Sequence, residues 1–127
     1  MIYLSELIGK VVSDSNGKLI GQLKDLVASI KSDATHPVIV AIVVKQKNGK
    51  NIIIPYSDVA VIIAPAIPLK NELNEIKPYQ PTENDIFLSE DILDKQIIDI
   101  NGTRVVRVND LELARVKGNL VVSNVDI

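Results

Sequence analysis

The stretch KVVSDSNGKLIGQLKDL, residues 10–26, decides the fold because a version of it occurs twice in the chain. It returns 85 residues later as KQIIDINGTRVVRVNDL, residues 95–111, with six identities in 17 aligned positions. The Leu-Ser-Glu of residues 4–6 also returns, at residues 88–90, so the register shifts by one residue between the two matches. A shared turn, shared charges and a sustained register indicate an internal repeat.

Each copy of the repeat reads as a β-hairpin, in which Asn-Gly separates two apolar stretches. Asn-Gly suits the two positive φ angles of a type I′ turn, which we therefore predict here. Gly21, in the second strand, predicts a bulge or a sharp bend. The carboxylates that follow are expected to accept backbone N–H bonds where the strand bends. The turn and repeat-motif residues are Asp14, Asn16, Gly17 and Asp25 in the first copy and Asp99, Asn101, Gly102 and Asp110 in the second.

The first copy continues into further strand signals. The apolar stretch 37–45 leads to a second Asn-Gly turn, residues 51–55 follow as its partner strand, and 56–59 looks like a short capped turn. A last short strand is expected over residues 59–64. With no segment of helical period, this pattern predicts an all-β, mainly antiparallel fold whose first domain, residues 1–69, is a small closed or nearly closed barrel.

The remaining chain divides into a linker and a shorter unit. Residues 70–83 contain two prolines and one stretch, 70–76, with apolar residues at helical spacing, so we expect a linker with one helical turn. Residues 84–127 hold the second copy, which lacks the last hairpin and strand of the first. The missing strands would leave a sheet edge with unpaired N–H and C=O groups, which proteins normally cover. The second unit can join the first barrel, pair with another chain or continue into further sequence, and we expect it to complete a homodimer by strand pairing.

Composition removes several functional classes. The chain of 127 residues is 46% hydrophobic, with 19 Ile and 16 Val, which is too apolar for a disordered protein. The absence of Cys excludes disulfide frameworks, zinc fingers, iron–sulfur ligation and thiol catalysis. A single histidine cannot build a multi-histidine metal site. We therefore expect no catalytic residue, no metal and no cofactor.

Charge argues against a nucleic-acid partner. Fourteen basic and sixteen acidic residues give a formal charge of −2, without the basic stripe of a nucleic-acid binder. The densest basic group (Lys45, Lys47 and Lys50) flanks a turn and reads as a solvated hairpin tip. The longest apolar run has about ten residues, against the ~20 that span a bilayer, and the N-terminus lacks the pattern of a signal peptide. We expect a cytoplasmic protein.

Two chemical alternatives are weak. Asp14 and Asp25 stand at the first and twelfth positions of a calcium-type loop, but apolar residues fill intervening ligand positions and strand signals replace the flanking helices. A hydrolase would have to unite Ser57 and Asp58 with His36, and nothing in their spacing brings the histidine to them. Tyr56 more plausibly plugs an end of the barrel, with its hydroxyl at the rim.

Taken together, residues 4–26 and 88–111 resemble the PRC-barrel family, the β-barrel of the photosynthetic reaction-centre H subunit and of a ribosome maturation factor that binds a small-subunit protein. The resemblance rests on the opening Leu-Ser-Glu, on the motif of residues 10–26 and on the closing Ile-Pro-Tyr-Ser-Asp-Val of residues 54–59. The second copy, residues 91–111, looks more specifically like a segment found before magnesium-transporter-type intracellular and CBS domains.

The resemblance implies a non-enzymatic adaptor or regulatory module, because members use the barrel to dock other proteins or to sit at a membrane face. The second copy implies a place in the cytoplasmic N-terminal part of a magnesium-transport-related protein, with membrane context supplied by sequence outside this chain. The alternative is a ribosome-associated or RNA-processing protein, which the charge of −2 disfavours. The protein partner is not identified by the sequence.

Overall fold

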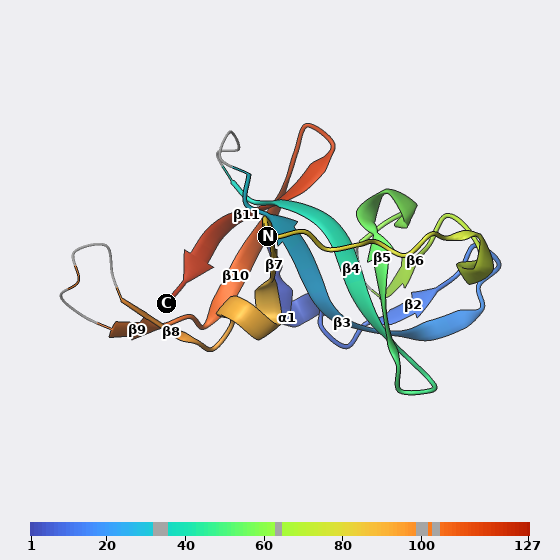
Figure 1. Ribbon diagram of the computed structural model, residues 1–127, viewed down its shortest axis with the longest axis horizontal. Helices are drawn as coiled ribbons and strands as arrows, with labels where there is room; N and C mark the ends of the chain where they lie inside the picture. Colours follow the sequence, from blue (N-terminus) through green and yellow to red (C-terminus); the bar gives the residue numbers. More distant parts are fainter. Residues whose placement is uncertain (32–35, 63–64, 99–101, 103–104) are drawn as a thin grey trace.

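The computed structural model describes residues 1–31, 36–62, 65–98, 102 and 105–127. Most of these residues belong to one strongly curled sheet, with a few short helical turns (Figure 1). The strands are β1 (Ile2–Tyr3), β2 (Val11–Ser13), β3 (Leu19–Ser29), β4 (Val38–Gln46), β5 (Asn51–Pro55), β6 (Ala66–Pro68), β7 (Asp85–Phe87), β8 (Gln96–Ile98), β9 (Val105–Arg107), β10 (Asp110–Val116) and β11 (Asn119–Asp126). The helical turns are α1 (Leu4–Leu7), the 3₁₀ turns η1 (Tyr56–Asp58) and η2 (Leu73–Glu75), and the π turn η3 (Leu88–Ile92).

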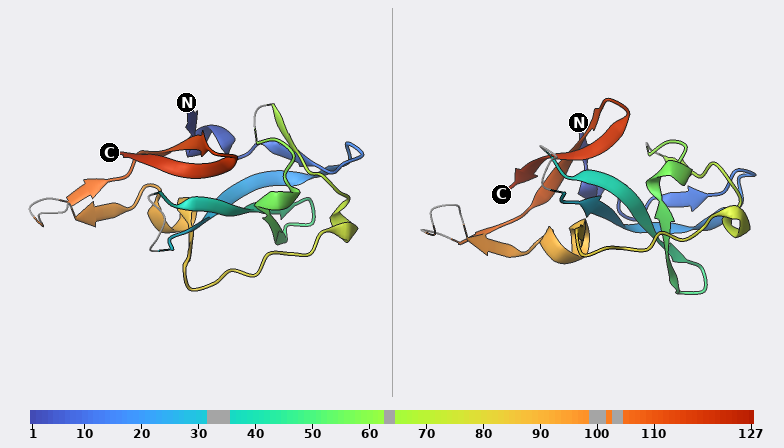
Figure 2. Two further views of the ribbon diagram at one scale, coloured as in Figure 1. Left: turned by 90° about the horizontal axis from the view of Figure 1, so that it is seen from above. Right: turned by 45° about the horizontal axis from the view of Figure 1, so that its top comes forward.

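The sheet runs in the order β1-β10-β11-β4-β3-β2-β6, with β5 paired to β4 and β7 paired to β3. All of these pairs are antiparallel except β2–β6, which is parallel. The hairpin β8–β9 forms a separate two-stranded sheet that projects from one end of the molecule (Figures 1 and 2). The expectation of a mainly antiparallel β fold is therefore confirmed.

The expectation of a closed or nearly closed barrel is wrong, because the sheet is an open half-barrel. Among the described residues, β1 and β6 end the path of strands and do not pair with each other. The edge of β4 that faces away from β3 pairs with both β5 and β11, so the strands of the second copy extend the sheet. The second hairpin thus joins the first unit within the same chain.

The strand expected over residues 59–64 is also misplaced. Val59 makes only an isolated bridge to Leu69, and the strand that follows is β6, beyond this stretch, on the far side of Pro65. Val59 and Ile62 are buried in the core. Ala60 and Val61, which lie between them, are exposed. The two buried positions reflect core packing, which needs no ladder of hydrogen bonds. Residues 63 and 64 lie outside the described residues.

The two described Asn-Gly turns are not type I′ turns. Gly17 and Gly49 have φ angles of 81° and 85°, but Asn16 and Asn48 are not among the residues of positive φ. Gly17 N–H donates to the Asp14 carbonyl and Asp14 N–H donates to that of Lys18. This pattern closes a three-residue loop with a glycine bulge, which needs only one positive φ angle.

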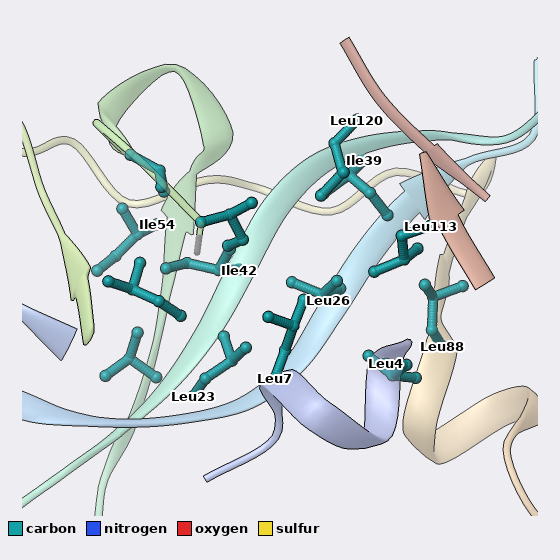
Figure 3. Close-up of a cluster of buried hydrophobic side chains, with 14 of the residues drawn as sticks. Leu4, Leu7, Leu23, Leu26, Ile39, Ile42, Ile54, Leu88, Leu113 and Leu120 are labelled. Carbon is teal, nitrogen blue, oxygen red and sulfur yellow. The ribbon is translucent and has the colours of Figure 1, made fainter. Parts of the chain in front are cut away.

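The larger of two hydrophobic clusters unites residues from both parts of the chain that carry the repeated motif. Leu4, Leu26 and Ile42 pack in the same cluster as Leu88 and Leu113, and all five are at most 1% exposed (Figure 3). The segment between η2 and β7 runs back along the sheet, where Tyr79 N–H donates to the Ile53 carbonyl of β5 (Figure 2). The Tyr79 hydroxyl donates to Asp85 at 2.7 Å, and burial together with this bond raises the pKa of Tyr79 to about 12. The expected helical turn in residues 70–76 is η2.

Gly21 lies where the backbones of β3 and β4 leave no room for a Cβ atom. A Cβ atom at this position would lie 2.9 Å from the Lys45 carbonyl carbon and closer still to the oxygen. Three bulges bend β3 against its neighbours, one opposite β2 and two opposite β4. The glycine is therefore required by backbone contact, since two backbones this close leave no room for a side chain.

We predict that Gly21→Ala destabilises the fold by about 3 kcal/mol, because the methyl group must push two paired strands apart. Urea denaturation followed by circular dichroism measures the change. The adjacent Gln22→Ala, at an exposed position of the same strand, is the control and should change stability by less than about 0.5 kcal/mol. Equal stability of the two variants would contradict the close approach.

Candidate functional site

The first strand of each stretch that carries the repeated motif pairs with a strand of the other stretch. β7, which opens the second copy, pairs with β3 of the first, with Phe87 opposite Val27 and Ile86 opposite Ala28. β1, which opens the first copy, pairs with β10 of the second. There Tyr3 lies opposite Glu112 and Ile2 lies opposite Leu113. In the repeat register of 85, Glu112 corresponds to Val27 and Leu113 corresponds to Ala28. The two pairings are therefore equivalent, and each copy supplies the other with its first strand.

The motif aspartates make the same exchange. The Asp25 carboxylate accepts hydrogen bonds from the backbone N–H groups of Ser89 (2.7 Å) and Glu90 (3.1 Å) at the start of η3, and of its neighbour Leu26 (2.7 Å). Asp25 is only 5% exposed. Its partners belong to the Leu-Ser-Glu of the opposite copy, so Asp25 caps a helical turn that lies 64 residues away in sequence.

Asp110 acts in the same way on the first copy. Its carboxylate accepts bonds from the N–H groups of Ser5 (3.1 Å) and Leu111 (2.8 Å) and from the Ser5 hydroxyl. Asp110 is half-buried, in contrast to Asp25. The first turn of a helix leaves N–H groups without a partner inside the helix, and these carboxylates supply the missing acceptors.

The one-residue shift in the repeat is located in η3. In α1, Ile8 N–H donates to the Leu4 carbonyl, whereas the corresponding bond in η3 joins Leu93 N–H to the Leu88 carbonyl and encloses one residue more. A π turn is the form that an inserted residue takes in a helix. After it, the register of 85 is restored, since Lys95 N–H donates to Ile92 as Lys10 N–H donates to Leu7.

Burial raises the pKa of Asp25 above its ordinary value of 3.8, although the three N–H groups that it accepts act in the opposite direction. The nearby Glu90 carboxylate adds a smaller upward effect. A carboxyl of raised pKa in a cleft is a possible general acid. The two oxygens of Asp25 are occupied by backbone donors, so the arrangement serves structure.

The remaining motif residues lie in the turns. The Asp14 carboxylate accepts the N–H groups of Asn16 and Lys18, both at 2.9 Å, and the Asn16 amide donates to Glu72. Gly102 has a φ angle of 68°, as its counterpart Gly17 has 81°. Asp99 and Asn101 lie outside the described residues.

The calcium and hydrolase alternatives gain no support from this geometry. Asp14 binds its own turn and Asp25 binds η3, so the two carboxylates have separate backbone partners. In the part of the chain that the structure describes, no group of three or more acidic or histidine side chains is placed to hold a metal ion. His36 and Ser57 line different hollows of the surface, and Asp58 accepts a bond from Asn71.

Sequence reasoning placed both aspartates at strand bends but missed that each reaches the opposite copy. The available signal was the recurrence of Leu-Ser-Glu ahead of each motif. The repeated Leu-Ser-Glu supplies the N–H donors of a helix cap, and the repeated aspartate supplies the acceptor. The linear sequence does not say which start each carboxylate caps.

Comparison with known families identifies the first part of the chain. The model of the PRC-barrel domain family matches residues 1–71, more than half of the chain. The chain belongs to this family. The resemblance inferred from residues 4–59 is thereby confirmed for the first copy, and the match includes β6 and the turn after it. The match shows a single PRC-barrel domain, without a second copy or a link to magnesium transporters. No curated protein matches the chain.

Within this PRC-barrel chain, none of the helices that the structure describes is both long enough and apolar enough to cross a membrane.

We predict that Asp25→Ala destabilises the protein by about 2–3 kcal/mol, because it removes a buried carboxylate and leaves the part-buried N–H groups of Ser89 and Glu90 without their acceptor. Asp110→Ala should cost only about 1 kcal/mol, since Ser5 is exposed and water can replace the lost oxygen at its N–H. Urea denaturation of the two variants side by side gives the comparison. A larger loss for Asp110→Ala would contradict the assigned burial.

The raised pKa of Asp25 predicts the pH dependence of this loss. Below pH 3.8 the carboxyl is neutral in both the folded and the unfolded chain, and above the folded-state pKa it carries a buried charge. The stability that Asp25 contributes is thus complete at low pH and decreases as the pH rises through the folded-state pKa. The advantage of the wild type over Asp25→Ala should be larger near pH 4 than at pH 7 in urea denaturation. An advantage that grows with pH would show that the N–H donors outweigh burial.

Proposed function

We propose that this PRC-barrel protein is a non-enzymatic protein-interaction module of the cytoplasm, acting as an adaptor or regulator. The observation that carries the proposal is the use of Asp14, Asp25 and Asp110, whose carboxylates all accept backbone N–H groups. Side chains held in this way build a scaffold and leave binding to the surface. The proposal also follows from the resemblance to family members that dock other proteins.

We further propose that residues 84–127 are a diverged, shorter copy of the same barrel unit. The support comes from the reciprocal strand pairs, β3–β7 and β10–β1, and from the reciprocal caps of Asp25 and Asp110. Equivalent positions in the two copies also share a positive φ angle, 91° at Gly9 and 60° at Asp94. A place within a magnesium-transport-related protein stays a proposal that rests on the resemblance of residues 91–111.

The homodimer expected from the sequence stays a prediction. Val121 of β11 pairs with Val38 of β4, so part of the edge of the second unit is paired within the same chain. Joining the first unit in this way is one of the three arrangements that the sequence allows. Sedimentation equilibrium distinguishes the species, because the chain has a mass of 13.9 kDa and a dimer twice that.

The adaptor proposal is tested by cross-linking the intact chain in an extract of its source cells and then measuring binding of each purified candidate by calorimetry. We expect at least one protein to bind with defined stoichiometry. The matched control is Gln22→Ala, which changes one exposed side chain. Absence of any stoichiometric protein partner would contradict the proposal. A salt-sensitive gel shift with ribosomal RNA would instead favour the RNA-associated alternative.

A further inference from the structure

β4 and β11 hold equivalent places in the two copies. Leu26 of β3 lies opposite Ile42 of β4, and Leu111 of β10 lies opposite Val125 of β11. The same irregularity follows in both pairs, after Val27 in the first and after Glu112 in the second. The strands β4 and β11 meet at Val38 and Val121, which are themselves equivalent positions.

In the first copy, β5 covers the free edge of β4. Ala41 pairs with Pro55 and Ile42 with Ile54, and the side chains of Ile42 and Ile54 are fully buried in the core (Figure 3). Leu7 of α1, in the same cluster, is only 2% exposed. A strand of sequence Asn-Ile-Ile-Ile-Pro thus seals this side of the first copy.

Among the described residues, no strand pairs with the corresponding edge of β11 from Ser123 to Asp126. On the side facing away from β10, the recorded bonds of β11 within the described residues end at Val122, whose N–H donates to the Pro37 carbonyl. Val125 is 42% exposed where its equivalent Ile42 is fully buried. Ile92, equivalent to Leu7, is likewise only half-buried.

A hollow of about 350 Å³ lies beside this edge. Its lining is mostly apolar and includes Ile86, Leu88, Ile92, Leu111, Val122 and Val125. An open strand edge next to an apolar hollow is the arrangement that accepts an added strand, where backbone pairing gives affinity and alternate side chains give specificity. The hollow is therefore a docking groove of the kind that β5 fills in the first copy.

We propose that the edge of β11 from Ser123 to Asp126 binds an extended segment of a partner protein, in the place that β5 holds on β4. The segment has β-branched apolar residues at alternate positions, as β5 has Ile52 and Ile54 on the side that faces the main core, because the groove is the equivalent of the surface that buries Ile54. This inference rests on the proposed interaction function and names the surface and the chemistry of its partner.

The test uses the intact chain and a fluorescein-labelled peptide of its own residues 50–56, Lys-Asn-Ile-Ile-Ile-Pro-Tyr. Fluorescence anisotropy should show saturable binding, and amide shifts should appear at Ser123–Asp126. Val125→Asp should weaken binding about tenfold or more, because the carboxylate loses water in the complex. Val116→Asp is the matched control, since Val116 is 46% exposed in the same hairpin and lies outside the groove.

A peptide with Ile54→Asp should also lose about tenfold or more in affinity, since Ile54 is the residue that β5 buries. Both protein variants are checked for folding by their amide spectra, which should match the wild type away from the substituted residue. No binding by the wild type, equal binding by Val125→Asp, or amide shifts along β4 in place of β11 would each overturn the proposal. A dimer that Val125→Asp dissociates would show that a second copy occupies the groove, and would overturn it as well.

The same variants separate this inference from the adaptor proposal. If the protein captured by cross-linking binds Val125→Asp as well as it binds the wild type, the adaptor function stands and the groove assignment fails. If the peptide binds the groove but no protein partner is captured, the groove assignment stands and the adaptor function fails.

Discussion

Two carboxylates tie the two halves of this chain together. Asp25 accepts the N–H groups at the start of η3, and Asp110 accepts the N–H of Ser5 in α1. A buried helical start without an acceptor would cost the desolvation of each N–H group. Each half caps part of its own helical turn, since Tyr3 N–H donates to Glu6 and Phe87 N–H donates to Asp91. The next N–H groups, of Ser5, Ser89 and Glu90, find their acceptors in the opposite half, so each helical turn is fully capped only when the two halves are folded together.

The remaining architecture follows from this exchange. The first strand of each half must cross to the other half along with its helical turn, which produces the pairs β3–β7 and β10–β1. The strands β4 and β11 then meet at Val38 and Val121, and one core forms from both halves. The edge of β4 that would close a barrel is already shared between β5 and β11, so the sheet stays curled and open.

The proposed binding function depends on a difference between the two halves. A PRC-barrel scaffold whose polar motif residues are bound to backbone groups offers its surface, and the surface differs most where β5 covers β4 and no described strand covers β11. An edge left open beside an apolar hollow is unfavourable for an isolated protein and favourable for one that receives a strand. The difference in strand cover is visible at one pair of equivalent positions, where Val125 is exposed and Ile42 is buried.

The sequence by itself determined the recurrence of one motif, the β-rich class and the family of residues 1–71, because each depends on local residue pattern. It misjudged the form of the Asn-Gly turns, since a three-residue loop with one positive φ angle suits Asn-Gly as well as type I′ does. It also read the apolar run of residues 59–64 as a strand, although Val59 makes only an isolated bridge. Only the tertiary structure decided that Asp25 and Asp110 cap opposite halves and that the barrel stays open. Those outcomes depend on which of two equivalent partners a residue meets, and two copies of the same motif carry no local signal that distinguishes them.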